Sequence, residues 1–196
     1  MNAVPGRKRS EASRQAILQA AFALMAEVGF DRMSIEGVAA RAGVGKTTIY
    51  RWWESRGVLA VEAFLTTVEP VIAFHDTGSA RKDMIAQMQA LATLYRGPTG
   101  RFVREIIGSS QSDPAMRGAF HDLFLTPRRD AARAVFKRGQ AAGEFRSDAD
   151  ADVAIDALYS PLYYRLLASD GPIGEAEVTQ IATLVLEGLN APQPVN

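Results

Sequence analysis

The sequence predicts an all-α fold of about nine helices, and three observations support this prediction. Apolar residues recur at three- and four-residue steps along nearly the whole chain, as on one face of an amphipathic helix. No segment shows the alternating pattern of a half-buried strand, and the hairpin-like dipeptide Asp170-Gly171 is followed by Pro172. The 196 residues suit one domain, or a small domain joined to a larger one.

The N-terminal part predicts three helices. The first carries an apolar stripe over residues 17–28 and ends where Gly29 can adopt the left-handed conformation. Ser34 is a candidate N-cap for a short second helix, which Gly43 ends. A third helix begins near Gly45.

Further apolar stripes and their end signals predict the remaining helices. They cover residues 58–68 before Pro70, 84–95 before Gly97-Pro98, 102–107 capped by Thr99, 116–124 after Asp113-Pro114, 131–136 before Gly143, 155–167 with a kink at Pro161, and 178–189. Thr126-Pro127 either kinks a helix or starts another.

Composition excludes several kinds of site. There is no cysteine, so disulfides, thiolate zinc sites and cysteine nucleophiles are impossible. Two histidines, His75 and His121, are too few for a three-His zinc site. No apolar run approaches the roughly 18 residues of a membrane span. The polar run 10–15 also argues against a signal peptide. We therefore expect a cytoplasmic protein with no metal, no cofactor and no membrane partner.

Asp148, Asp150 and Asp152 imitate the start of a calcium loop. However, Val153 stands where that loop needs glycine, and Tyr159 stands where it needs glutamate. Acidic capping of a helix N-terminus explains the three carboxylates better.

Residues 40–47 match the sequence motif of a phosphate-binding loop at every fixed position except one. The motif Gly-x-x-x-x-Gly-Lys-[Ser/Thr] would need glycine where Ala40 stands, and such a loop follows a buried strand. The residues before this segment predict a helix instead. A nucleotide-hydrolysing enzyme using Gly43 to Thr47 remains the alternative function from a different class.

The segment from Ser34 to Trp53 has the length and the glycine-containing turn of a helix-turn-helix. Ile49 and Trp53 share the inward face, which leaves cations, hydroxyls and aromatic rings on or beside the outer face. That outer set is Lys46, Thr47, Thr48, Tyr50, Arg51 and Trp52. Residues 1–56 carry a net charge of +4 and the remainder −4, so a polyanion would meet only the front of the chain.

The segment AARAGVGKTTIYRWW, from Ala39 to Trp53, resembles the DNA-binding domain of TetR-family transcriptional regulators, with similarity over about residues 13–65. The resemblance implies a homodimeric regulator, usually a repressor, which leaves double-stranded operator DNA when a small molecule binds its C-terminal domain. The operator of a two-fold dimer should be near-palindromic.

The resemblance also assigns roles by position. It implies that Ser34 touches phosphate, that Lys46, Thr47 and Thr48 open the recognition helix, and that Tyr50 contacts phosphate. Arg51 and Trp52 would lie near the DNA backbone or bases. The family's Pro-Ser-Lys is Glu54-Ser55-Arg56 here, so Arg56 can replace the lysine at a phosphate, although Glu54 adds a like charge.

These inferences divide the chain into a DNA-binding domain, residues 1–56, and a helical ligand-binding and dimerisation domain, residues 57–196. Arg7, Lys8 and Arg9 form an N-terminal arm that either adds DNA contacts or is only a soluble tail. Segments 138–145 and 160–167 resemble one C-terminal subgroup of the family.

Two sets of residues are predicted for the C-terminal domain. A mostly apolar ligand pocket would be lined by Met88, Leu91, Tyr95, Phe102, Phe120, Phe124 and Tyr163. The last two helices would form a four-helix bundle with a second copy through Leu158, Leu162, Leu166, Val178, Ile181, Val185 and Leu189. The alternatives are that these residues only fill the monomer core, and that the regulator has no ligand.

Overall fold

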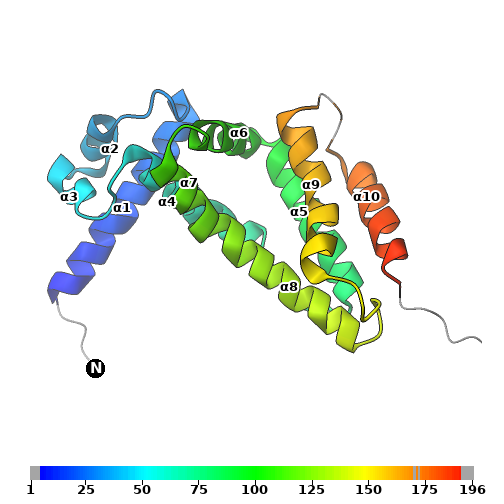
Figure 1. The fold of residues 1–196 in the computed structure, drawn as a ribbon. Coiled ribbons are helices and arrows are strands. Elements are labelled where there is room, and N and C mark those ends of the chain that lie inside the picture. Colours follow the sequence, from blue (N-terminus) through cyan, green and yellow to red (C-terminus); the bar gives the residue numbers. More distant parts are fainter. Residues whose placement is uncertain (1–4, 170, 172, 191–196) are drawn as a thin grey trace, which may run out of the picture. The chain divides into compact units, whose positions relative to one another are not determined.

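A computed structural model describes residues 5–169, 171 and 173–190, with side chains from residue 11 onward, and this part of the chain is helical as predicted (Figure 1). Its elements are α1 (Pro5–Val28), α2 (Ile35–Ala42), α3 (Lys46–Tyr50), α4 (Arg56–Val68), η1 (Glu69–Val71), α5 (Ala80–Arg96), α6 (Pro98–Ser110), α7 (Pro114–Phe120), η2 (His121–Leu125), α8 (Thr126–Ala141), α9 (Ala151–Leu167) and α10 (Glu175–Gly188). Within these ranges the only extended pairing is the isolated bridge between Phe145 and Asn190. None of the described helices is long and apolar enough to cross a membrane.

The contacts divide the chain into two compact units. Unit 1 comprises Met1–Glu69 and Phe102–Phe124, and unit 2 comprises Pro70–Arg101 and Leu125–Asn196. In unit 1, α4 packs against α1 and α7, because most of its residues are apolar and buried. The compact units therefore group α4 with the N-terminal helices, whereas the functional division after Arg56 stays a prediction.

The first helix begins earlier than the sequence suggests. Because α1 starts at Pro5, the backbone of Arg7, Lys8 and Arg9 is helical, and the prediction of an arm ahead of the first helix is wrong. The side chains of these three residues lie outside the described ones. At its other end α1 stops before Gly29, which takes the predicted left-handed conformation with a φ of 84°.

The middle of unit 1 shows one close approach. A Cβ on Gly57, in the first turn of α4, would lie 2.9 Å from Met116 Cβ and 3.1 Å from Asp113 Oδ2. Asp113 itself caps α7, as predicted, by accepting a hydrogen bond of 3.0 Å from the Met116 amide. The absence of a side chain at Gly57 thus lets the starts of α4 and α7 meet.

One helix boundary differs from the predictions, and a second agrees with one of the two predicted outcomes, because α8 starts at Thr126. Thr99 does not cap the sixth helix, because α6 begins at Pro98, and proline fits the start of a helix where no amide partner is needed. The run from α7 through η2 to α8 is helical without interruption, and η2 is a π-turn directly before Thr126. Pro127 offers no amide to the carbonyl of Leu123, which accounts for a local change of helical hydrogen bonding there.

Unit 2 is built on α5, α8, α9 and α10, with α5 in contact with the other three (Figure 1). Its core contains side chains from every one of these helices, among them Met88, Phe136, Leu158 and Ala182. Asp150 caps α9 by accepting from the amides of Asp152 and Val153, both at 2.9 Å, so one of the three clustered carboxylates acts as predicted. Asp148 and Asp152 instead pair with arginines.

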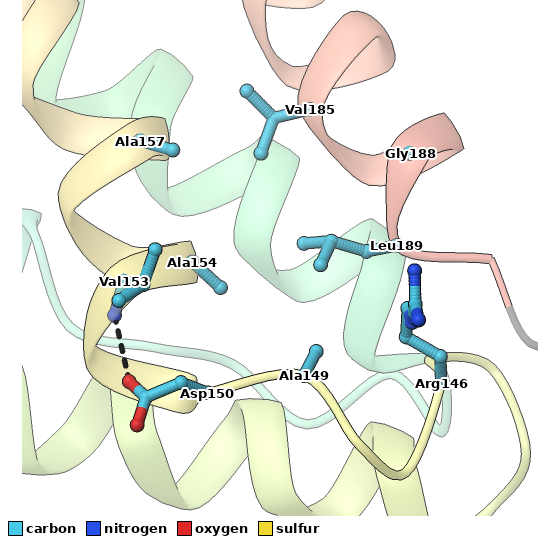
Figure 2. Close-up of a pocket in the computed structure, with 9 residues that line it drawn as sticks. All are labelled: Arg146, Ala149, Asp150, Val153, Ala154, Ala157, Val185, Gly188 and Leu189. Atoms are coloured by element: carbon cyan, nitrogen blue, oxygen red, sulfur yellow. Dashed lines mark hydrogen bonds between the residues drawn. The ribbon is translucent and has the colours of Figure 1, made fainter.

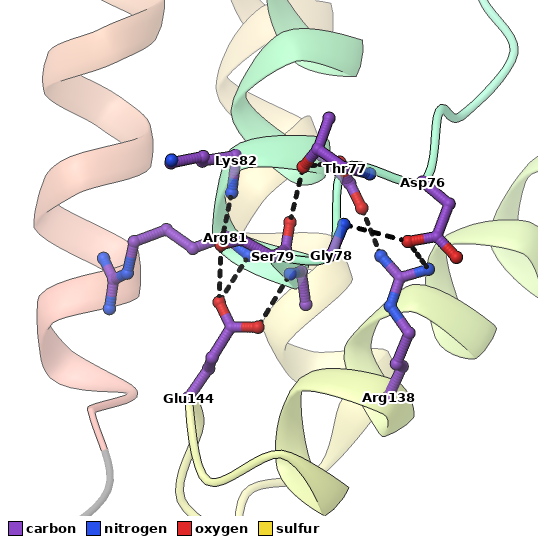
Figure 3. A network of polar contacts seen from close by, with 10 residues as sticks. Asp76, Thr77, Gly78, Ser79, Arg81, Lys82, Arg138 and Glu144 are labelled. Carbon is purple, nitrogen blue, oxygen red and sulfur yellow. Dashed lines mark hydrogen bonds and ion pairs between the residues drawn. The ribbon is translucent and has the colours of Figure 1, made fainter.

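A polar network fastens the start of α5 to the loop after α8 (Figure 3). The Glu144 carboxylate accepts hydrogen bonds from Ser79 Oγ at 2.8 Å, the Ala80 amide at 2.8 Å and the Arg81 amide at 3.1 Å. These amides are among those that a helix N-terminus leaves without an intrahelical partner. Glu144 therefore caps α5 from a loop 63 or more residues away in the sequence.

Candidate functional site

The helix-turn-helix is present as predicted and is held by local capping. Ser34 Oγ accepts a hydrogen bond of 3.0 Å from the Gly37 amide and so begins α2. Gly43 ends that helix with a φ of 66°, and the Val44 amide then donates to the Ala39 carbonyl over 3.0 Å. Gly45 precedes α3, whose five residues make it shorter than the helix predicted to reach Trp53.

The two faces of α3 and the residues after it are sharply different. Ile49 and Trp53 are 0% and 1% exposed, whereas Tyr50 and Trp52 are 55% and 40% exposed. Inward packing thus fixes the segment and presents its polar and aromatic side chains outward, as predicted. The exposed members of the predicted DNA-binding set are Ser34, Lys46, Thr47, Tyr50, Arg51 and Trp52, and Thr48 and Arg56 are half-buried.

Lys46 already has an anionic partner within unit 1. Its ammonium lies 2.9 Å from Glu36 Oε1 on α2, and this hydrogen bond and charge raise the pKa of Lys46 and lower the pKa of Glu36. Ser34 is also engaged, but its hydroxyl accepts in the cap and still has a hydrogen to donate.

Arg56 has a structural task that the sequence did not reveal. Its Nη1 donates to the carbonyls of Asp31 and Met33 at 2.9 and 3.0 Å, and the guanidinium lies 4.5 Å from the centre of the Phe30 ring. These contacts hold the turn between α1 and α2 against the start of α4. The structure therefore gives no support to the phosphate contact carried over from the family's lysine.

A second cluster in unit 1 is absent from the sequence predictions. Glu62, on α4, accepts a hydrogen bond of 2.5 Å from Trp53 Nε1 and forms an ion pair with Arg14 on α1. The Arg14 guanidinium also lies about 6 Å from the ring centres of Trp52 and Trp53. A glutamate among the apolar residues of the fourth helix was the signal that could have indicated such a cluster.

The predicted ligand residues fall into two groups. Phe102, Phe120 and Phe124 belong to unit 1, where Phe120 and Phe124 stack with their ring centres 5.1 Å apart. The other four belong to unit 2, where Tyr95 and Tyr163 lie with ring centres 5.8 Å apart. The members in unit 2 are Met88, Leu91, Tyr95 and Tyr163, the first three buried and Tyr163 half-buried.

Tyr95 and Tyr163 of this group lie near a polar cluster. Tyr159 Oη donates to Gln87 Oε1 over 2.7 Å, and Gln87 Nε2 and Arg128 Nη1 both donate to the Ile72 carbonyl, at 3.3 and 2.8 Å. Burial raises the pKa of the Tyr95, Tyr159 and Tyr163 hydroxyls, and the positive charge of Arg128 opposes this rise at all three. Gln87, Arg128 and Tyr159 are not among the site residues predicted from the sequence.

An open groove of about 440 Å³ lies elsewhere in unit 2, between α9, α10 and the loop before α9 (Figure 2). Figure 2 shows Val185 of α10 and Leu189, directly after α10, facing Ala154 and Ala157 of α9 across it. None of the predicted ligand residues lines it. Two of the predicted dimer residues, Val185 and Leu189, do.

The predicted dimer residues divide by burial. Leu158, Leu162, Leu166 and Val178 are at most 6% exposed and fill the monomer core, whereas Ile181, Val185 and Leu189 are half-buried. The exposed apolar side chains of the same two helices lie on other positions. They are Val153, Ala157, Tyr164 and Leu167 on α9 and Ala176 and Leu184 on α10.

The enzymatic alternative lacks its structural context. The Gly43–Thr47 segment follows a helix, α2, and not a strand. Among the described residues, no group of three or more His, Cys, Asp or Glu side chains could hold a metal ion.

Comparisons with known proteins agree with this geometry. Residues 17–63 match the family described as "Bacterial regulatory proteins, tetR family", and residues 74–185 match "Tetracyclin repressor-like, C-terminal domain". The HTH-type transcriptional regulator YdeS of Bacillus subtilis (strain 168) is 33% identical over 191 residues, which cover 97% of this chain and 96% of YdeS. The "DNA-binding transcriptional repressor TetR" of Mycobacteroides abscessus is 28% identical over 91% of this chain and 94% of its own.

A solved structure shows the same fold. The crystal structure of the TetR family transcription regulator SCO0332 matches with a TM-score of 0.82 and 36% identity, covering 90% of this chain and 98% of that one.

Proposed function

Because the chain belongs to the TetR family of bacterial regulators, and so is an HTH-type transcriptional regulator and not an enzyme, we propose that it is a homodimeric repressor that a small-molecule effector releases from a near-palindromic operator. The observation that carries this proposal is the two-sided α3 segment. Ile49 and Trp53 anchor it inward, and the cations, hydroxyls and rings around them face solvent.

The outward residues have distinct chemical tasks in this proposal. Arg51 can form paired hydrogen bonds with a guanine edge or with a phosphate. The Thr47 and Tyr50 hydroxyls suit phosphate oxygens, which fix the register of a protein on the duplex. Lys46 contributes a point charge after it leaves Glu36.

We place the dimer face on the outer side of α9 and α10. Val153, Tyr164, Leu167 and Leu184 are between 45% and 74% exposed, which is unusual for large apolar side chains on two neighbouring helices. The groove of Figure 2 continues this apolar surface through Val185 and Leu189. A second copy related by two-fold symmetry would bury both, and that symmetry is the reason to expect a near-palindromic operator.

The effector is proposed to bind inside unit 2, beside Met88, Leu91, Tyr95 and Tyr163. Large apolar side chains with a few polar groups between them are typical of small-molecule sites. Such an effector acts as an inducer only if it binds the DNA-incompetent state more tightly, with a typical coupling of about 1–3 kcal/mol.

The test is selection of bound duplexes from a random DNA library near physiological salt, with wild type and Arg51→Ala in parallel. We expect wild type to recover one near-palindromic sequence and Arg51→Ala to recover none, while both elute as dimers. Salt-sensitive binding without sequence preference, or no binding, would refute the proposal. Turnover of ATP with magnesium that Lys46→Ala abolishes would favour the nucleotide alternative instead.

A further inference from the structure

Tyr95 carries a buried hydroxyl group without a hydrogen-bond partner. The residue is 3% exposed, and among the described residues its Oη is the only buried side-chain polar atom of this kind. The neighbouring Tyr163 hydroxyl raises the pKa of Tyr95 and lies close to it, but the two hydroxyls do not meet the geometry of a hydrogen bond. Buried polar groups in proteins are nearly always paired, so an exception needs an explanation.

The neighbouring polar groups are held in fixed positions. Tyr159 is tied to Gln87, and the Ile72 carbonyl holds both Gln87 and Arg128. The same residues therefore cannot swing toward Tyr95 without breaking bonds of their own. An external acceptor would supply the partner that the Tyr95 hydroxyl lacks.

The surroundings define the chemistry of that group. Burial raises the pKa of Tyr95 and Tyr163, so both hydroxyls stay protonated at neutral pH and can donate. The positive charge of Arg128 acts on Tyr95, Tyr159 and Tyr163. Hydroxyl donors within the field of a positive charge favour an anionic oxygen acceptor.

The apolar neighbours define the rest of the ligand. Met84, Met88 and Leu91 occupy the same face of α5 as Tyr95, at spacings of three and four residues, and all are at most 4% exposed. Methionine side chains adapt readily to the shape of a bound molecule. A ligand that reaches Tyr95 would therefore have a mainly apolar body.

We propose that the Tyr95 hydroxyl is the polar anchor of the effector site and that the effector is a small carboxylate with an apolar body. This inference rests on the proposed function only in treating the bound molecule as the effector. Its tests use the protein without DNA, so their failure is separate from a failure of operator selection.

The first test compares two tyrosine variants in the ligand-free protein. Tyr95→Phe removes an unpaired hydroxyl, so the urea midpoint should stay the same or rise. Tyr159→Phe removes the donor to Gln87, so its midpoint should fall. An equal fall in both variants would show that the Tyr95 hydroxyl has a partner in the free protein, which would overturn the proposal.

The second test uses matched probes in calorimetric titrations: benzoate with benzyl alcohol, and octanoate with 1-octanol. We expect a carboxylate to bind wild type more tightly than its alcohol, and Tyr95→Phe to lose about tenfold or more in affinity for it. Equal binding within each pair, equal binding by Tyr95→Phe, or no binding of either carboxylate would overturn the proposal.

Discussion

The indole nitrogen of Trp53 donates a hydrogen bond of 2.5 Å to Glu62 Oε2, which joins the segment after α3 to the middle of α4. The other carboxylate oxygen pairs with Arg14, whose guanidinium lies beside both tryptophan rings. Two helices of unit 1, α1 and α4, and the segment after α3 therefore meet at one carboxylate. The orientation of the proposed DNA-reading surface depends on it.

Glu62→Ala should lower both stability and operator affinity. The change leaves the buried Trp53 N–H unpaired, and we expect a loss of about 1–3 kcal/mol in the free energy of unfolding. Urea denaturation measures the first effect and a DNA titration the second. Glu27→Ala, which removes an exposed pair with Arg41, is the matched control and should change neither much. Equal effects of the two variants would contradict the role of Glu62.

Arg51 and Arg56 should respond differently to salt. Arg51 is exposed, so Arg51→Ala should weaken operator binding and, if it contacts phosphate, reduce the slope of log K against log salt by about one. Arg56→Ala should lower stability, because the Asp31 and Met33 carbonyls lose their donor, but leave the slope unchanged. A reduced slope of log K against log salt in Arg56→Ala would show that Arg56 does contact a phosphate.

The sequence predicts local structure well where one residue decides it. Gly29 and Gly43 take the left-handed conformation, and Ser34 and Asp113 cap helices, as their residue types indicate. The helix-turn-helix follows from these signals and from the inward pair Ile49 and Trp53. Each of these features depends on neighbours within a few positions of the chain.

The rest depends on contacts between distant residues, which a single sequence does not reveal. Arg56 binds carbonyls 23 and 25 positions away, and Tyr159 meets Gln87 across 72 positions. Helical spacing shows that α9 has an apolar stripe, but not that Leu158 faces the core while Tyr164 faces solvent. The predicted dimer residues were therefore partly core residues.

Gly139→Ala should destabilise unit 2. A Cβ at this position would overlap the Phe145 ring, which is stacked on Phe136 with ring centres 5.0 Å apart. Overpacking of this kind costs about 1–3 kcal/mol, measurable as a lower urea midpoint. Gly118→Ala is the control, since nothing lies within 4 Å of its Cβ position in α7, and it should be neutral or stabilising. A normal midpoint for Gly139→Ala would show that Phe145 moves aside without cost.

Stability should fall in acid through Asp83. Burial alone would raise the pKa of this carboxyl group, but hydrogen bonds from Thr77 and the Arg138 guanidinium outweigh it, so the pKa is lowered in the folded state. A lowered pKa gives stability that is complete above the unfolded pKa and is lost as pH falls through the folded one. Asp83→Asn should flatten the acid side of the profile of unfolding free energy against pH. Parallel pH profiles for wild type and Asp83→Asn would show that Asp83 does not contribute to the loss of stability in acid.

Leu184→Glu should dissociate the proposed dimer. Leu184 is 74% exposed on α10, so the charge should not disturb the monomer but would be buried without a partner in the dimer. Sedimentation velocity should show monomers. Leu123→Glu, at a 45% exposed position in η2, should remain dimeric. Dimeric Leu184→Glu would exclude this face.

The ion pair between Lys46 and Glu36 has a consequence for how the protein searches a genome. A phosphate that approaches Lys46 must displace a tethered carboxylate as well as diffusing ions, because Glu36 lies 2.9 Å from the ammonium. On unrelated DNA sequences the protein makes few other contacts that could offset the loss of the Lys46–Glu36 ion pair. Its residence time on such DNA is therefore shortened. A matching site supplies the remaining contacts at the same time. In the proposed complex, Glu36 would thus compete with phosphate for Lys46 and favour release from DNA that lacks the operator sequence.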